Sequence, residues 1–104
     1  MPTPHHPPRA AQKTLKRLGA DIREARLRRD LPMVQVAERA MTSRSTLQRV
    51  ERGDHTVGIG IYAAVLQVLG LLDRLGEVAD PAADETGQLL YAARLPKRAR
   101  TRRR

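Results

Sequence analysis

The sequence predicts an all-α fold in which five helices form one small bundle. Apolar residues recur three or four positions apart along residues 12–80, which is the spacing of the buried face of a helix. Several of the expected helices are short and follow one another closely, so they can pack within one domain. A core this small is usually stabilised by helix packing or by dimerisation.

The first two helices follow a segment of different composition. Residues 1–11 are rich in proline and histidine and are expected to form a flexible arm. The first helix is expected over residues 12–29, with lysines and arginines on its outer face and an apolar side made of Leu15, Leu18, Ile22, Ala25 and Leu27. Pro32 cannot donate a backbone hydrogen bond and therefore suits the start of the second helix. That helix covers residues 33–40 and carries Val36, Ala37 and Ala40 on one side.

The third helix is expected between Ser43 and Gly53. Ser43 is a good N-cap residue because its hydroxyl oxygen can accept from an unpaired amide of the first turn. Gly53 suits the left-handed residue that ends many helices. Leu47 and Val50 form a narrow apolar side that can pack on a small core. Because only two residues separate this helix from the second, the pair forms a helix-turn-helix arrangement.

The fourth and fifth helices are expected on either side of Gly70. Apolar residues at helical spacing precede it (Ile61, Val65, Leu66, Val68 and Leu69) and follow it (Leu71, Leu72, Leu75 and Val78). The helical domain is therefore expected over residues 12–80. Residues 81–104 are expected to be a linker and a basic tail, in which residues 88–95 form either a helical turn or an edge strand.

The exposed side of the third helix carries groups that can read DNA bases. Its polar residues are Arg44, Ser45, Gln48 and Arg49. Arginine binds guanine, and glutamine binds adenine, through two hydrogen bonds in the major groove. A short helix with an apolar back and a hydrogen-bonding front is what a recognition helix requires. The alternative is an ordinary solvated amphipathic helix.

The sequence resembles the Xre/Cro-type helix-turn-helix domain, with its lambda-repressor-like fold, in the order and spacing of residues 18–29, 36–39, 43–53 and 68–72. More narrowly, it resembles the HipB-like antitoxins of HipA-type kinase toxins, and residues 94–100 are similar to endings in that subgroup. The resemblance covers roughly residues 14–80. It implies a sequence-specific repressor that regulates its own gene and neutralises a HipA-like kinase toxin. A stand-alone Xre-family regulator without a toxin partner is the alternative.

Three residues depart from the pattern of that family. Asp30 stands where a glycine commonly ends the first helix, and Met41 replaces the glycine of the turn. A residue other than glycine at a positive φ costs stability. Met33 replaces a glutamine that contacts phosphate in relatives, which removes the basis for one contact to the DNA backbone.

The resemblance also implies an ion pair between Arg26 and Glu51, which would brace the first helix against the third through charge-assisted hydrogen bonds. Such a pair would hold Arg26 near the DNA backbone. The alternative is that both side chains point into water. The side chains expected to hold phosphates are Arg23, Arg26, Ser43, Thr46 and Thr56.

The formal net charge of +9 is unevenly distributed. Residues 94–104 contain seven lysines and arginines and no acid, whereas residues 73–85 contain five acids and one arginine. A basic domain and a basic tail favour binding to polyanions. The alternative for the tail is a solvated, disordered charge run. A protein that coats nucleic acid without reading its sequence would bind through this tail alone.

A homodimer on an inverted-repeat operator in double-stranded DNA is expected. One recognition helix contacts only about four base pairs, which is too few for specificity in a genome. The leucine-rich end of the domain offers a candidate interface, made of Leu69, Leu71, Leu72 and Leu75. Burial of these leucines in their own core is the alternative. The resemblance to HipB-like proteins adds Leu89, Leu90 and Tyr91, which could instead fold back onto their own bundle.

Other function classes find no support in the sequence. The chain has no cysteine, and His5 and His6 without further ligands make a poor metal site, so no metal or cofactor is expected. No nucleophile–base pair stands out, and the neighbours Asp54 and His55 have no third group, so catalysis is not expected. Two tyrosines are too few for single-strand binding by base stacking. No apolar run approaches the roughly 18 residues of a membrane span, so we expect a bacterial cytoplasmic protein at the nucleoid.

Overall fold

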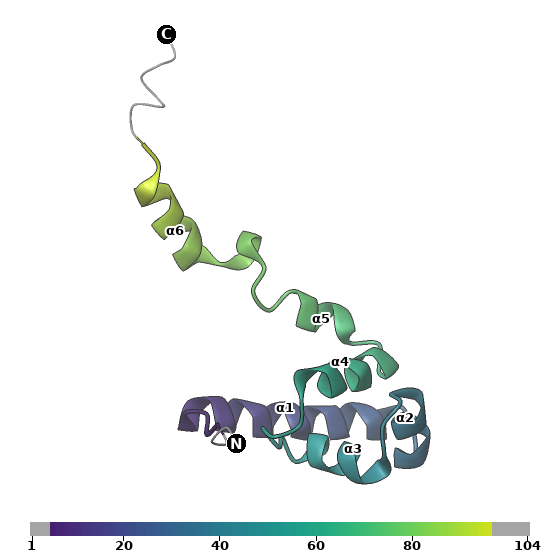
Figure 1. The fold of residues 1–104 in the computed structure, drawn as a ribbon. Coiled ribbons are helices and arrows are strands. Elements are labelled where there is room, and N and C mark those ends of the chain that lie inside the picture. The colour runs from purple at the N-terminus through teal and green to yellow at the C-terminus, as the bar shows by residue number, and fades with distance from the viewer. Residues whose placement is uncertain (1–4, 97–104) are drawn as a thin grey trace. The chain divides into compact units, whose positions relative to one another are not determined.

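The computed structural model describes residues 5–96, which contain six α-helices, one short 3-10 helix and no strand (Figure 1). The prediction of an all-α fold is confirmed. The chain forms two compact units, Met1–Asp73 and Arg74–Arg104. The division falls before residue 80, where the sequence had suggested the end of the domain.

Helix α1 (Arg9–Arg28) begins earlier than the sequence suggested. Residues 9–11, which were assigned to the flexible arm, are helical. Pro8 is the N-cap residue, with φ −56° and ψ 156°, and its carbonyl oxygen accepts from the amide of Gln12 at 3.0 Å. The side chain of Gln12 also donates to the carbonyl oxygen of Pro7 at 2.8 Å. The prolines therefore precede the helix and help to start it, rather than keeping residues 9–11 extended.

Three shorter helices complete the first unit: α2 (Met33–Arg39), α3 (Arg44–Glu51) and α4 (Ile59–Val68) (Figure 1). Helix α3 packs against α1, α2 and α4, and α2 also packs against α4. The buried apolar residues come from these four helices and the residues that flank them. They are Ile22, Val36, Ala37, Ala40, Leu47, Val50, Val57, Tyr62, Val65, Leu66 and Leu69.

All four helices end in the same hydrogen-bonding pattern. At the end of α3, the amide of Gly53 donates to the carbonyl of Val50 at 2.9 Å, and the amide of Asp54 donates to that of Arg49 at 3.0 Å. Equivalent pairs of bonds close α1, α2 and α4. This is the Schellman motif, which needs one residue in the left-handed conformation.

Glycine occupies that left-handed position in only two of the four motifs. Gly53 and Gly70 end α3 and α4 with φ of 72° and 78°. Asp30 and Met41 end α1 and α2 with φ of 52° and 58°, at the positions where the resemblance led us to expect glycine. A side chain in this conformation costs about 1–2 kcal/mol relative to the right-handed region.

The second unit is built from two short elements packed together, a 3-10 helix at Pro81–Ala83 and helix α6 (Glu85–Arg94). The side chain of Asp84 caps α6 by accepting from the amide of Gly87 at 3.0 Å. Gln88 donates to the carbonyls of Pro81 and Ala82 at 3.0 and 2.9 Å. Residues 88–94, which the sequence left open between helix and strand, are therefore helical.

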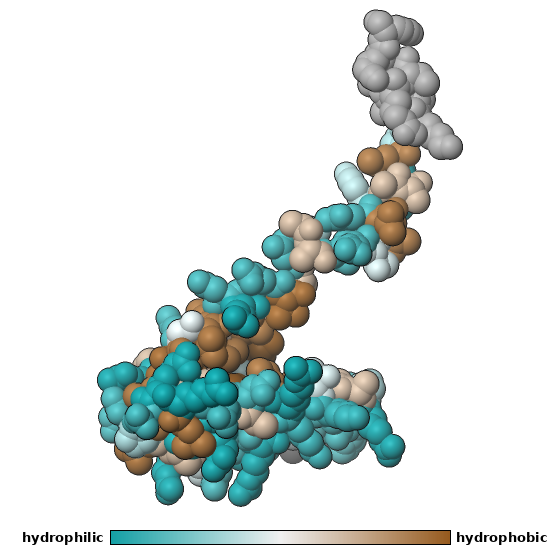
Figure 2. Space-filling model, turned by 180° about the vertical axis from the view of Figure 1, so that it is seen from behind, coloured by the Kyte–Doolittle hydropathy of each residue, from teal (hydrophilic) through white to brown (hydrophobic). Residues whose placement is uncertain are grey.

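Apolar side chains remain exposed in the second unit. Leu89, Leu90 and Tyr91 are 72%, 64% and 61% exposed, and no residue of α6 is buried. Figure 2 shows apolar side chains along this helix, and it shows many hydrophilic side chains on the first unit. Helix α5 (Leu72–Gly76) lies across the division between the units and also has no buried residue. Among residues 5–96, no helix is long and apolar enough to cross a membrane.

Candidate nucleic-acid interface

Helix α3 separates an apolar side from a polar side, as the sequence suggested. Leu47 and Val50 are both 0% exposed. The residues expected to read bases, Arg44, Ser45, Gln48 and Arg49, are all exposed. At its start, the hydroxyl oxygen of Ser43 accepts from the amide of Thr46 at 3.1 Å, so the N-cap prediction is confirmed. An eight-residue helix is too short to be stable alone, and its packing has to hold it in place.

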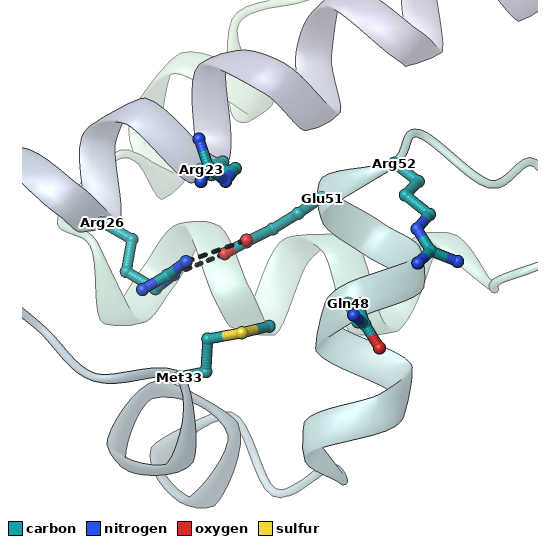
Figure 3. A pocket seen from close by; sticks show the side chains of 6 residues that line it. All are labelled: Arg23, Arg26, Met33, Gln48, Glu51 and Arg52. Carbon is teal, nitrogen blue, oxygen red and sulfur yellow. Dashed lines mark hydrogen bonds and ion pairs between the residues drawn. The ribbon is translucent and has the colours of Figure 1, made fainter.

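A buried ion pair connects α3 to α1 (Figure 3). Arg26 Nε donates to Glu51 Oε2 at 2.6 Å, and its Nη2 donates to Oε1 at 3.1 Å. The side chains of Arg26 and Glu51 are only 9% and 6% exposed. The third nitrogen of the guanidinium, Nη1, donates to the carbonyl of Leu31 at 3.1 Å, beyond the end of α1. The structure thus brings together the two residues for which the resemblance implied a pair.

The same contacts argue against the second role expected for Arg26. All three nitrogens of its guanidinium hydrogen-bond within the protein, and the residue is 8% exposed. A buried arginine whose charge is neutralised by a carboxylate attracts a phosphate group only weakly. The contacts of Arg26 therefore favour a role in bracing α3 over the expected contact to phosphate.

A shallow pocket of about 280 Å³ lies beside this brace, between α1, α2 and α3 (Figure 3). Arg23, Met33, Gln48 and Arg52 line it together with the ion pair. Arg23 and Arg52 are exposed cations, and no ion pair is recorded for either within residues 5–96. Arg52 was not singled out from the sequence, although it follows directly after Glu51. Met33, at the position where the resemblance implied a glutamine, adds an apolar wall to this pocket.

Two hydroxyls at the start of α3 hydrogen-bond to each other. Ser43 Oγ donates to Thr46 Oγ1 at 2.9 Å. The hydroxyl hydrogen of Thr46 therefore stays available for another acceptor. Of these two expected phosphate contacts, Thr46 is the one with a free donor.

Arg49 is held by the loop that follows α3. Its Nε donates to Asp54 Oδ2 at 2.9 Å, and its Nη2 donates to Thr56 Oγ1 at 2.6 Å. Thr56 in turn donates to Asp54 Oδ1 twice, from its hydroxyl at 2.6 Å and from its amide at 2.8 Å. Both donors of Thr56 are thus engaged beside a carboxylate, which makes Thr56 a poor phosphate contact.

These hydrogen bonds stabilise the ionised carboxylate of Asp54. Donation from the Thr56 hydroxyl, then from Arg49 and the Thr56 amide, holds the pKa of Asp54 well below its usual range. The loop is also tied to the core, because the hydroxyl of Tyr62 donates to the carbonyl of Asp54 at 2.8 Å. Burial raises the pKa of Tyr62, and the nearby charge of Asp54 adds to that effect.

The residues expected to form a dimer interface differ in their exposure. Leu69 is 3% exposed and lies in the core of its own bundle. For this leucine, burial in its own core, the alternative to a dimer contact, is what the structure shows. Leu71, Leu72 and Leu75 are only partly covered. The three candidates on α6 are exposed, as described above.

The remaining sequence predictions concern metal binding and the two ends of the chain. Within residues 5–96, no group of three or more histidine, aspartate or glutamate side chains is arranged to hold a metal ion. The rings of His6 and His55 lie 6.3 Å apart, centre to centre. Residues 1–4 of the expected arm and residues 97–104 of the basic tail are outside the described part of the chain.

The comparisons with known proteins agree with this geometry. A family described as a helix-turn-helix domain matches residues 17–78, which include α2, the turn and α3. No curated protein and no solved structure was found to match the chain. The family match to residues 17–78 covers more than half of the sequence. The chain therefore belongs to the helix-turn-helix domain family of DNA-binding regulators.

Proposed function

We propose that the protein is a sequence-specific transcriptional repressor that reads its operator with α3. The observation that carries this proposal is the division of α3 into two sides. Its apolar side is completely buried and braced by Arg26 and Glu51, so the exposed side is presented in a fixed orientation. Arg44, Ser45, Gln48 and Arg49 on that side supply donors and acceptors that match base edges in the major groove.

Contacts to the DNA backbone would come from the pocket beside the brace and from the start of α3. Arg23 on α1 and Arg52, the C-cap residue of α3, supply exposed cations, and Thr46 supplies a free hydroxyl. Such contacts position a protein on DNA without reading sequence. Each phosphate neutralised also steepens the loss of affinity with salt.

Binding as a homodimer on an inverted repeat would supply the specificity that a single α3 lacks. The apolar residues that the first unit leaves partly covered, and those that α6 leaves exposed, are available for this contact. Of these, α6 is the better candidate, because Leu89, Leu90 and Tyr91 are exposed together within one turn. An apolar group of this kind commonly marks an interaction site.

An antitoxin role is the finer form of the same proposal. A HipB-like antitoxin would repress its own gene and also bind a HipA-like kinase toxin. The exposed apolar side chains of α6 support it, because an apolar group of this kind can contact a partner protein as well as a second copy of the chain. The alternative is a stand-alone Xre-family regulator. Purification from the native host decides between them, because an antitoxin should carry the product of a neighbouring gene with it.

The primary test is fluorescence anisotropy with the duplex upstream of the protein's own gene and a shuffled duplex of equal length, across a salt series. A specific repressor should prefer the native duplex by about 1000-fold, and Arg44→Ala should reduce this preference. Equal affinity for both duplexes with a steep salt slope would contradict the proposal. That result would favour sequence-blind binding through the basic tail, which removal of residues 94–104 would then abolish.

A further inference from the structure

We propose that Asp54 is a positioning residue that fixes the guanidinium of Arg49 and thereby sets its preference for guanine. Asp54 was not expected to take part in DNA recognition, and it lies outside α3. The inference rests on the proposed function, because it concerns how one residue of the recognition helix reads a base.

The geometry leaves one particular edge of Arg49 free. Nε and Nη2 lie on the same side of the guanidinium and donate to Asp54 and Thr56 at 2.9 and 2.6 Å. These bonds use two of the five N–H donors of an arginine. Of the other three donors, two lie in parallel at the end of the side chain, one on Nη1 and one on Nη2. Two parallel donors at this end match the O6 and N7 acceptors of guanine.

Asp54 is itself held firmly enough to act as a reference point. The left-handed Gly53 brings the amide of Asp54 back to the carbonyl of Arg49 at 3.0 Å. The carbonyl of Asp54 accepts from Tyr62, which is 4% exposed and part of the core. Its carboxylate accepts two bonds from Thr56. Backbone and side chain of Asp54 are therefore both tied down, while the side chain of Arg49 is 45% exposed and would otherwise be mobile.

Fixing an arginine in this way favours a base with two acceptors over a base with one. A free guanidinium can turn to donate a single bond to many acceptors, including phosphate oxygens. A guanidinium held on one edge can present only its end, and guanine satisfies both donors there. Fixing it also reduces the conformational freedom lost on binding.

If Asp54 masks Arg49 from DNA instead of positioning it, the expected effects of removing Asp54 are the opposite. If Asp54 only masked Arg49, its carboxylate would compete with the DNA for the same guanidinium and repel nearby phosphates. Removing it would then raise affinity for every duplex and leave the preference for guanine unchanged or stronger. If Asp54 positions Arg49, removing it weakens the preference for guanine.

The test uses the full chain and duplexes selected from a library with a randomised central segment. Arg49→Ala first identifies the operator guanine that depends on Arg49. Duplexes carrying each base at that position are then compared with the parent, Asp54→Ala and Asp54→Asn. Asp21→Ala is the matched control, because Asp21 is an exposed aspartate paired with Arg17 at 3.9 Å on α1, and its removal changes the net charge equally.

We expect Asp54→Ala to reduce discrimination at that guanine about tenfold, within the range of one bidentate contact. Asp54→Asn keeps an oxygen that can accept from Thr56 and so preserves the loop, and it should lose part of the discrimination. Asp21→Ala should leave discrimination intact while affecting affinity for all duplexes alike. In an Arg49→Ala background, Asp54→Ala should have no effect on base preference.

The outcomes also separate this inference from the proposed function. Unchanged or increased discrimination in both Asp54 variants, with discrimination lost in Arg49→Ala, would overturn the positioning role and leave the recognition role of α3 intact. If Arg44→Ala and Arg49→Ala both leave base preference unchanged, the proposed function itself fails. Thermal unfolding of each variant shows whether it is folded under the binding conditions.

Discussion

Gly19 of α1 and Gly53 at the end of α3 lie in direct backbone contact. A Cβ on Gly19 would lie 2.5 Å from the amide nitrogen of Gly53 and 2.6 Å from the carbonyl oxygen of Val50. A Cβ on Gly53 would meet the carbonyl oxygen of Leu15 on α1. The two helices thus approach each other where neither has a side chain. The Arg26–Glu51 pair joins them again about two turns farther along α1.

Gly19→Ala should therefore destabilise the protein by about 2–3 kcal/mol, since the backbone atoms it meets cannot move aside as a flexible side chain would. Urea denaturation followed by circular dichroism measures this change. Gly60→Ala is the control, because no atom lies within 4 Å of a Cβ at that helical position. It should stabilise the protein by about 0.5 kcal/mol through helix propensity. Equal effects of the two substitutions would contradict the close contact.

Loss of one partner of the Arg26–Glu51 pair should destabilise more than loss of both. Glu51→Ala leaves a buried guanidinium unpaired and should cost about 3–5 kcal/mol, which approaches the whole stability of a small domain. The double variant Arg26→Met/Glu51→Leu removes both charges and fills the space with apolar groups. It should be more stable than either single variant in thermal unfolding. Additive losses would indicate that the two residues contribute independently.

Met41→Gly should stabilise the protein by about 0.5–1 kcal/mol. Glycine removes the cost of a side chain at a φ of 58°, and its greater freedom in the unfolded chain offsets only part of that gain. Met41 is 93% exposed, so little packing is lost. Met41→Ala is the control, because alanine keeps the left-handed strain, and it should leave the thermal midpoint nearly unchanged. Stabilisation by alanine equal to that by glycine would rule out backbone strain as the cause.

The contribution of Asp54 to stability should depend on pH. Its pKa is lowered in the folded state, so the folded protein favours the carboxylate. The stabilisation is therefore present above the unfolded pKa of about 3.9 and is lost as pH falls through the folded pKa. The difference in free energy of unfolding between the parent and Asp54→Asn should be constant near neutral pH and should narrow below about pH 4. If this difference stays the same down to the lowest accessible pH, the ionised carboxylate of Asp54 does not stabilise the folded protein.

If α6 forms the dimer contact, Leu90→Glu should convert the dimer to a monomer. A charge placed in an apolar contact has to be desolvated without a partner, which is costly. Sedimentation equilibrium measures the association state, and affinity for the operator should fall with it. Thr86→Glu adds the same charge to an exposed position on the same helix and should leave the dimer intact. A dimeric Leu90→Glu protein would place the interface elsewhere.

Features fixed by neighbouring residues could be predicted from the sequence, as the ends of α3 illustrate. A serine cap and a left-handed glycine both act through bonds to residues three to five positions away, and both are present in the structure. The apolar spacing that placed Leu47 and Val50 in the core is equally local. In contrast, the start of α1 depended on how Pro7 and Pro8 bond to Gln12, which composition alone does not reveal.

The candidate site was less predictable where tertiary contacts decide the role of a side chain. Arg26 and Arg49 are both arginines near the recognition helix, yet one is buried and neutralised and the other is exposed and held on one edge. The difference arises from Glu51 and Asp54, whose positions depend on the packing of α1 and on the loop after Gly53. Similarly, Leu69 resembles its leucine neighbours in sequence, and only the end of α4 places it in the core.

The two-sided build of α3 has a consequence for how the base preference of such a protein can change over time. Arg44, Ser45 and Gln48 are exposed, so single replacements there can redirect recognition without disturbing the core of the bundle. Arg49 is different, because it shares its hydrogen bonds with Asp54. A new residue at position 49 would leave that carboxylate without its cation. We therefore expect that, among related proteins, a substitution at position 49 is accompanied by a substitution at position 54.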